Sequence, residues 1–174
     1  MKKKYVLTIL VFAGAFVLAT TDRYNSVREG FVLGTPEIKS ISALTFGPDG
    51  ILFIGDSKSA SVFALDTKDN QNVDKASPVE LKKFDQKVAA ALGTEVQNVS
   101  IQDLIVNPVS KKIYCAVQLN DGTPALLKVD GGKIEAVSLK DVSFSKVELT
   151  NAPGEDDKDQ RGRPTRPLAI SDIG

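Results

Sequence analysis

Short apolar runs, several of them alternating with polar residues, are separated along this chain by turns that contain Pro, Asn or Gly, which is the pattern of β-strands. The clearest group of strands is expected at about 100–107, 112–118, 124–130 and 133–139. Asn120-Asp121-Gly122 and Asp130-Gly131-Gly132 separate the last three, and Asp-Gly between apolar runs is typical of β-hairpins. A second group is expected at about 40–46, 51–55, 61–66 and 78–83. The pattern therefore predicts an all-β protein.

The two groups of strands repeat each other. Ser40 to Pro48 aligns with Ser100 to Pro108, and a third copy begins at 168–174, where Asp172 matches Asp103. Four-stranded antiparallel units repeated along a chain are the blades of a β-propeller. The repeat predicts blades at about 40–83 and 100–139 and the start of a third blade at 168–174. A β-sandwich built from the same strands is the alternative.

Two segments interrupt the strand pattern. A short helical insertion is expected at about 84–93, since Ala89 to Ala91 favour a helix and Gly93 suits its C-terminal cap. A loop is expected at about 140–166. In a four-stranded meander both insertions would join the end that carries the turns at 56–60 and 119–123, opposite the proline turns at 47–50 and 107–110. Because loops on a rigid scaffold carry binding groups, we expect a site on this elaborated face.

The first residues have the organisation of an export signal. Lys2, Lys3 and Lys4 precede an apolar run from Tyr5 to Leu18, which is shorter than the roughly 20 residues of a membrane-spanning helix. Residues up to Ala19 suit a signal peptidase. We expect cleavage of the signal peptide 1–19 and export of residues 20–174 to the periplasm or medium, with no membrane span left. An uncleaved N-terminal anchor is the alternative.

The composition of the chain excludes several kinds of catalytic site. The 174 residues include 22 basic and 22 acidic side chains, no histidine and one cysteine, Cys115. The absence of histidine excludes a Ser-His-Asp or Cys-His centre, and the zero formal charge gives no indication of nucleic-acid binding. Cys115 stands within an expected strand, so we interpret it as a buried, inert thiol rather than a reactive one.

The segment Leu44 to Asp56, LTFGPDGILFIGD, resembles the blade motif of six-bladed propellers of the NHL-repeat and gluconolactonase/regucalcin-like groups. Residues 30–174 also look like the N-terminal part of exported bacterial propeller proteins of unknown function. That likeness is carried by Lys87 to Gly93, Ile101 to Lys112, Asn151-Ala152-Pro153 and Arg161-Gly162-Arg163. The resemblance implies about two blades of a longer propeller. The gluconolactonase-like enzymes hold a divalent metal through Glu, Asn and Asp, and no residue of this chain is matched to those ligands.

Asp103 and Asp172 are the candidate metal ligands. The repeat places them at matching positions near the start of innermost strands, where two carboxylates could hold Ca²⁺. The alternative is that each carboxylate accepts hydrogen bonds from neighbouring backbone N–H groups. The charged run Glu155 to Asp159, followed by Arg161, Arg163 and Arg166, would either grip an anionic glycan or phosphate or keep a loop solvated.

These features predict an exported binding module that is non-catalytic as it stands. Its partner would be a small molecule, a glycan or a protein held on the elaborated face. The alternative is part of a gluconolactonase-like or quinoprotein-dehydrogenase-like enzyme, whose centre further blades would complete.

Overall fold

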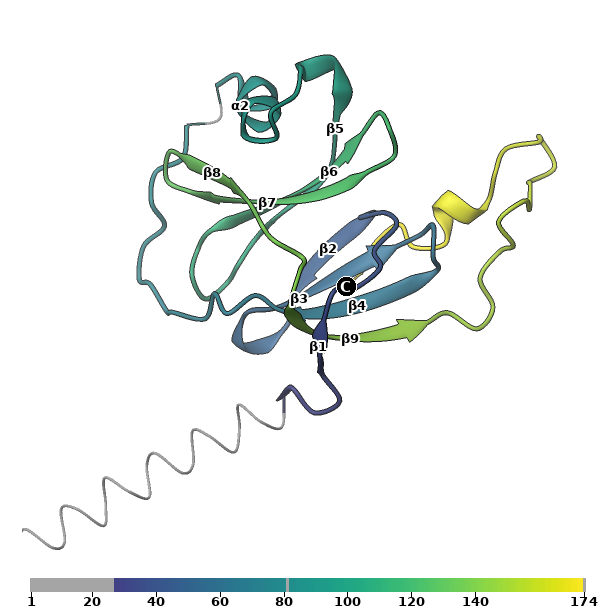
Figure 1. Ribbon diagram of the computed structural model, residues 1–174, viewed down its shortest axis with the longest axis horizontal. Coiled ribbons are helices and arrows are strands. Elements are labelled where there is room, and N and C mark those ends of the chain that lie inside the picture. Colours follow the sequence, from purple (N-terminus) through teal and green to yellow (C-terminus); the bar gives the residue numbers. More distant parts are fainter. Residues whose placement is uncertain (1–26, 81, 174) are drawn as a thin grey trace, which may run out of the picture. The chain divides into compact units, whose positions relative to one another are not determined.

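The computed structural model describes residues 27–80 and 82–173, so the expected signal peptide 1–19 lies outside the described residues. The chain divides into Met1–Phe31 and a compact unit, Val32–Gly174, which contains the strands described below. That unit holds two antiparallel sheets and the helix α2 (Figure 1). Within 27–80 and 82–173, no helix is long and apolar enough to cross a membrane.

The first sheet has five strands in the order β1-β9-β4-β3-β2. Its strands are β1 (Val32–Gly34), β2 (Ala43–Phe46), β3 (Ile51–Asp56), β4 (Ser61–Asp66) and β9 (Val142–Glu148). The short 3-10 turn η1 (Pro48–Gly50) joins β2 to β3, as its proline and glycine predicted. All neighbouring strands of this sheet are antiparallel.

The outer strand beside β4 differs from the prediction. This strand was expected at 78–83, but the described residues there, 78–80 and 82–83, form no strand. The segment 142–148 was expected to be a loop and instead forms β9. β9 pairs with β4 from Ser61↔Glu148 to Leu65↔Phe144. Phe144 also packs against the core, so β9 buries an apolar side chain while it completes the backbone hydrogen bonds of β4.

The second sheet has four strands in the order β5-β6-β7-β8, as predicted. They are β5 (Val99–Val106), β6 (Ile113–Leu119), β7 (Pro124–Asp130) and β8 (Lys133–Ala136), and the 3-10 turn η2 (Val96–Asn98) precedes β5. The antiparallel order repeats that of β2, β3 and β4, but the register differs by one residue: Leu44 pairs with Ile54, whereas Leu104, its counterpart in the repeat, pairs with Cys115. The sequence repeat therefore corresponds to a repeat of strand order.

The two sheets share one apolar core. Leu52, Ile54 and Phe63 of the five-stranded sheet cluster with Tyr114 and other buried side chains of the four-stranded sheet. The Phe46 and Tyr114 rings pack edge to face, with ring centroids 5.1 Å apart. The inner faces of the sheets therefore stabilise each other.

The helix α2 (Phe84–Ala91) covers the other face of the four-stranded sheet. Val88 is fully buried against Cys115, Val117 and Leu127, whose neighbours along the strands point into the shared core. Burial raises the pKa of the Cys115 thiol to about 11, which agrees with an inert thiol.

The segment 168–173 does not form the predicted strand of a third blade. The 3-10 turn η3 (Arg166–Leu168) is followed by chain without regular structure. Ile170 is buried against Gly55, on the face of the five-stranded sheet that points away from the four-stranded sheet. The Ser57 hydroxyl donates to the Ile170 carbonyl (2.9 Å) and accepts from its N–H (3.2 Å). The Ser57 side chain therefore pairs with the backbone N–H and carbonyl of Ile170, which a neighbouring strand would pair with in a blade.

Candidate functional site

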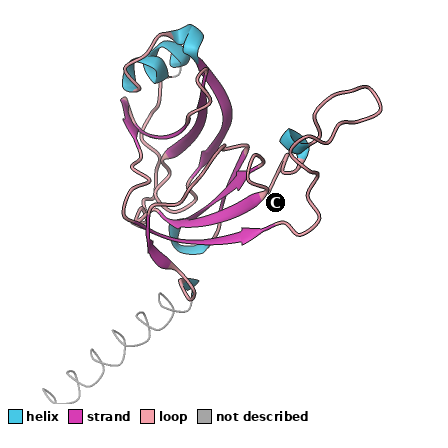
Figure 2. Cartoon of the chain, turned by 45° about the vertical axis from the view of Figure 1, so that its right-hand side comes forward, coloured by secondary structure: helices cyan, strands magenta, loops and turns pink. Residues whose placement is uncertain are grey.

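Polar side chains gather at both ends of the strands. The loop end carries the turn after β3, at 57–60, and the turn after β6, at 120–123. The proline-turn end carries the turns at 47–50 and 107–112. The long loop after β9 leaves the five-stranded sheet at the loop end, as predicted (Figure 2), and Arg166, which follows this loop, donates from Nε to the Lys58 carbonyl. The chain after β4 instead begins at the proline-turn end, contrary to the prediction, because Asp69 hydrogen-bonds to residues of the 107–112 turn.

Asp56, at the last position of β3, organises the loop end. Its fully buried carboxylate accepts hydrogen bonds from the Lys39 N–H (2.7 Å) and the Ser40 hydroxyl (2.6 Å), and from the hydroxyl (2.7 Å) and N–H (3.1 Å) of Ser59. Burial alone would raise the pKa of Asp56, but these hydrogen bonds outweigh it and hold the pKa below its usual value. The carboxylate therefore fixes the backbone on both sides of Lys58.

A groove of about 390 Å³ lies beside this turn. We call it the cationic groove; its lining residues are Lys39, Lys58, Glu155, Pro164, Arg166 and Pro167. Three cationic side chains and one carboxylate face this volume. Two prolines form a rigid apolar wall, since their rings fix the backbone. The groove therefore combines positive charge with an apolar surface.

Arg166 is the most firmly held cation of the groove. Its guanidinium donates from Nε to the Lys58 carbonyl (3.2 Å) and from Nη1 to the Pro153 carbonyl. Both acceptors are neutral, and within the described residues Arg166 forms no ion pair, although the Glu155 carboxylate lines the same groove. The guanidinium still has N–H groups for a ligand, since it carries five.

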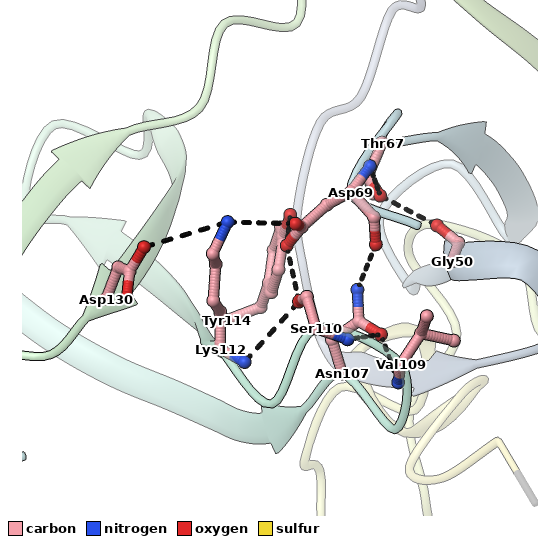
Figure 3. Close-up of polar contacts among 9 residues, drawn as sticks. All are labelled: Gly50, Thr67, Asp69, Asn107, Val109, Ser110, Lys112, Tyr114 and Asp130. Atoms are coloured by element: carbon pink, nitrogen blue, oxygen red, sulfur yellow. Dashed lines mark hydrogen bonds and ion pairs between the residues drawn. The ribbon is translucent and has the colours of Figure 1, made fainter. Parts of the chain in front are cut away.

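The opposite end of the strands holds a second polar cluster, drawn in Figure 3. We call it the Asp69 joint; its members are Asp69, Asn107, Ser110, Lys112 and Tyr114. The Asp69 carboxylate accepts from the Ser110 hydroxyl (2.8 Å), the Tyr114 hydroxyl (3.0 Å) and the Lys112 ammonium (3.0 Å). Asn107 donates to the Asp69 carbonyl (2.8 Å). Because Asp69 follows β4 and the others belong to β6 and its preceding turn, the joint ties the two sheets together.

The electrostatics of the joint favour a charged Asp69. Burial opposes ionisation, but the hydrogen bonds from Ser110, Lys112 and Tyr114 hold the pKa of Asp69 below its usual value. Burial, and then the nearby carboxylate, raise the pKa of Tyr114 well above the ordinary phenol value. The hydrogen bond to Asp69 raises the pKa of Lys112. The charge of Asp69 is therefore balanced by Lys112, and its carboxylate oxygens accept three hydrogen bonds within the joint. These contacts suit a structural role rather than catalysis, because Asp69 is already engaged as an acceptor.

The two candidate metal ligands occupy different environments. Asp103 accepts from the Leu44 N–H of β2 and from the Leu104 N–H, both at 2.7 Å. These backbone donors are the alternative to a metal that the sequence left open, and the bond to Leu44 links β5 to β2. Asp172 is exposed and accepts from the Ile173 N–H (2.8 Å). In the described part of the chain, no three His, Cys, Asp or Glu side chains are grouped to hold a metal.

Sequence reasoning identified Arg166 but missed Lys39, Lys58 and Asp69. Lys58 stands in the Asp-Ser-Lys-Ser turn after β3, which was interpreted only as a turn. Asp69 lies three residues after β4, where a short polar side chain suggests a turn. Its partners Ser110, Lys112 and Tyr114 are far away in the sequence, so local pattern gave no signal for the joint. Comparison with protein-family models, curated proteins and solved structures gives no match for this chain.

Proposed function

We propose that this chain is an exported, non-catalytic module that binds an anionic small molecule or glycan in the cationic groove. The observation that carries the proposal is the excess of positive charge in the groove, where Arg166, Lys39 and Lys58 face one carboxylate, Glu155, beside an apolar wall. The Asp56 hydrogen bonds support it, because they hold the backbone that presents both lysines.

The expected complex is weak and sensitive to salt. Lys39 and Lys58 are exposed, and an exposed ion pair contributes only about 0–1 kcal/mol. Arg166 is partly buried and can present two parallel N–H donors to a carboxylate or phosphate, which adds geometric specificity. Screening by salt is effective at such a surface, because the Debye length is only about 8 Å at physiological ionic strength.

The test is a calorimetric titration with glucose 6-phosphate, with an oligogalacturonate and, as the uncharged reference, with glucose. At least one anion should bind at low salt, and 0.5 M NaCl should weaken the complex. Lys58→Ala and Arg166→Gln should each weaken binding about fivefold or more, whereas Lys140→Ala removes an exposed cation outside the groove and should have no effect. Equal binding by Arg166→Gln and the unaltered protein, or no anion binding at all, would contradict the proposal.

We also propose that the two sheets are neighbouring blades of a β-propeller. The repeated antiparallel order of β2–β3–β4 and β5–β6–β7, in segments whose sequences align, supports this, since a β-sandwich shares a core but has no need of a repeated unit. Leu33 and Val147 remain 74% and 66% exposed on the five-stranded sheet. The test is sedimentation of residues 20–174 at several concentrations. Two blades with an uncovered face should self-associate, whereas a completed sandwich should remain monomeric.

A further inference from the structure

Residues 71–79, which we call the arch, lie over the proline-turn end of the four-stranded sheet. The arch is attached at two points: the Val73 N–H donates to the Val109 carbonyl (3.2 Å), and Ser77 packs against Gly131. Residues of the arch and residues of the sheet together line a cavity of about 250 Å³. This cavity is separate from the cationic groove, since no residue lines both.

Positive charge exceeds negative charge on the walls of this cavity. Three ammonium groups line it, those of Lys75, Lys111 and Lys112, against one carboxylate, that of Asp130. The lining therefore has a formal charge of +2, from three positive groups and one negative group. A charge of +1 remains when the Asp69 carboxylate, which contacts Lys112, is included. Such an excess favours a ligand of negative charge.

Lys112 is already paired with carboxylates. Its ammonium lies 3.0 Å from a carboxylate oxygen of Asp69 and 3.7 Å from one of Asp130 (Figure 3). The hydrogen bond to Asp69 raises the pKa of Lys112, which keeps the ammonium charged and the pair intact. Lys112 is therefore a fixed part of the cavity wall, and an anion in the cavity needs other cations as its partners.

Lys75 and Lys111 are those cations. Neither forms an ion pair with a carboxylate of residues 27–80 and 82–173. The Lys111 ammonium donates to the Pro108 carbonyl, which is neutral and leaves two of its three N–H groups for a ligand. Lys75 belongs to the arch and Lys111 to the turn before β6, so an anion that accepts from both would join the arch to the sheet.

We propose that the cavity under the arch binds a phosphate group, with Lys75 and Lys111 as its cationic partners. A phosphate monoester carries a charge of about −1.5 to −2 at neutral pH, which matches two ammonium groups better than the single charge of a carboxylate does. Its oxygens are strong acceptors, and Gln71 and Ser77 line the same cavity with further donors. Valine side chains from both walls offer an aliphatic surface to the rest of an esterified ligand; they are Val73, Val79 and Val129.

The experiment is a ¹⁵N chemical-shift titration of the protein purified after expression of the complete sequence. The probes are inorganic phosphate and glucose 6-phosphate, with glucose as the uncharged reference and sodium chloride to match the ionic strength. A phosphate probe should give saturable shifts at 71–79 and 110–112 that glucose and chloride do not give. The tighter of the two probes shows whether the cavity prefers free or esterified phosphate. Because each shift is assigned to a residue, binding here is measured separately from binding in the cationic groove.

Charge-neutralising variants test the two lysines. Lys75→Gln combined with Lys111→Gln should weaken phosphate binding about tenfold or more, because both charges are lost while long polar side chains remain. Asp130→Asn should strengthen binding about threefold, since it removes the carboxylate that lines the cavity. The matched control, Lys82→Gln combined with Lys140→Gln, removes the same amount of charge from exposed positions outside the cavity and should leave the affinity unchanged.

Three results would overturn the inference: no saturable shift at the arch with either phosphate probe, the same shifts with glucose, or unchanged affinity in the double variant of Lys75 and Lys111. Arg166→Gln should leave the shifts at the arch unchanged, because Arg166 lines the groove and not this cavity. Phosphate binding at the arch without anion binding in the groove would refute the groove alone, and the reverse result would refute the cavity alone.

Discussion

Replacement of Asp69 by alanine tests whether the joint stabilises the contact between the two sheets. In the substituted protein, the hydroxyls of Ser110 and Tyr114 lose their acceptor, although these residues are only 5% and 1% exposed. A buried polar group without a partner costs about 1–3 kcal/mol, so the two hydroxyls together cost about 2–6 kcal/mol. The lost ion pair adds little, because Lys112 is partly exposed and retains Asp130. We expect Asp69→Ala to lower the free energy of unfolding by about 4 kcal/mol.

The measurement is equilibrium urea unfolding followed by far-ultraviolet circular dichroism, since the chain has no tryptophan for fluorescence. For a chain of this size, about 4 kcal/mol corresponds to a melting temperature lower by about 8–16 °C. The matched control is Asp74→Ala, an exposed carboxylate in the same segment, which should change stability by less than about 0.5 kcal/mol.

A double-mutant cycle separates the hydrogen bond from general packing. Tyr114→Phe alone should cost about 1 kcal/mol, because Asp69 loses one donor. In the Asp69→Ala background the same change should cost less or be neutral, since the hydroxyl has already lost its Asp69 acceptor. Additive effects of the two substitutions, or equal stabilities of Asp69→Ala and Asp74→Ala, would refute the structural role of the joint.

The remaining predictions concern stability in acid, the packing of Gly55 against Ile170, and the hydrogen bonds of Asp103. The lowered pKa values of Asp56 and Asp69 contribute stability above about pH 4, the usual aspartate value, and this stability is lost as the pH falls. Urea unfolding of Asp56→Asn should therefore depend less on pH between 5 and 3 than that of the unaltered protein. Gly55→Ala should cost about 1–3 kcal/mol in urea unfolding, because the new Cβ would lie 2.6 Å from Ile170 Cγ2, and Ile170→Ala should relieve part of this cost. Asp103→Ala should lower stability by about 1–3 kcal/mol with or without Ca²⁺, because it leaves backbone donors unpaired; a Ca²⁺-dependent melting temperature that Asp103→Asn abolishes would instead assign this carboxylate to a cation.

The strands that lie close together in the sequence were predictable, because alternation and turn residues act locally. β3 and β4 follow the Pro48-Asp49-Gly50 turn almost as expected, and β5 to β8 follow their Asp-Gly turns. Asp49 and Gly50 both have positive φ, at 55° and 73°, which is why a turn-forming pair stands there. Local chemistry thus determines these hairpins.

The long-range pairings could not be predicted in the same way. Residues 78–83 and 142–148 both contain alternating apolar positions in the sequence, yet β4 pairs with 142–148, and the described residues 78–80 and 82–83 form no strand. The choice depends on Phe144, which reaches the core that the two sheets share, and this core is defined only after both sheets are placed. The cationic groove lies at the end where a site was expected and includes Arg166, but the placement of Lys39 and Lys58 depends on the hydrogen bonds of Asp56, which no local pattern indicated.

The pairing of β9 with β4 has a consequence for the order of events during synthesis. Residues 61–65 can complete their backbone pairing only after residues 144–148 have been made, by which time the whole of the four-stranded sheet has been synthesised. Pairings between distant parts of a chain form slowly, because loop closure costs entropy before any contact compensates for it. Until then β4 presents an open edge to other chains, so a ribosome-bound intermediate should be most prone to aggregate in this interval.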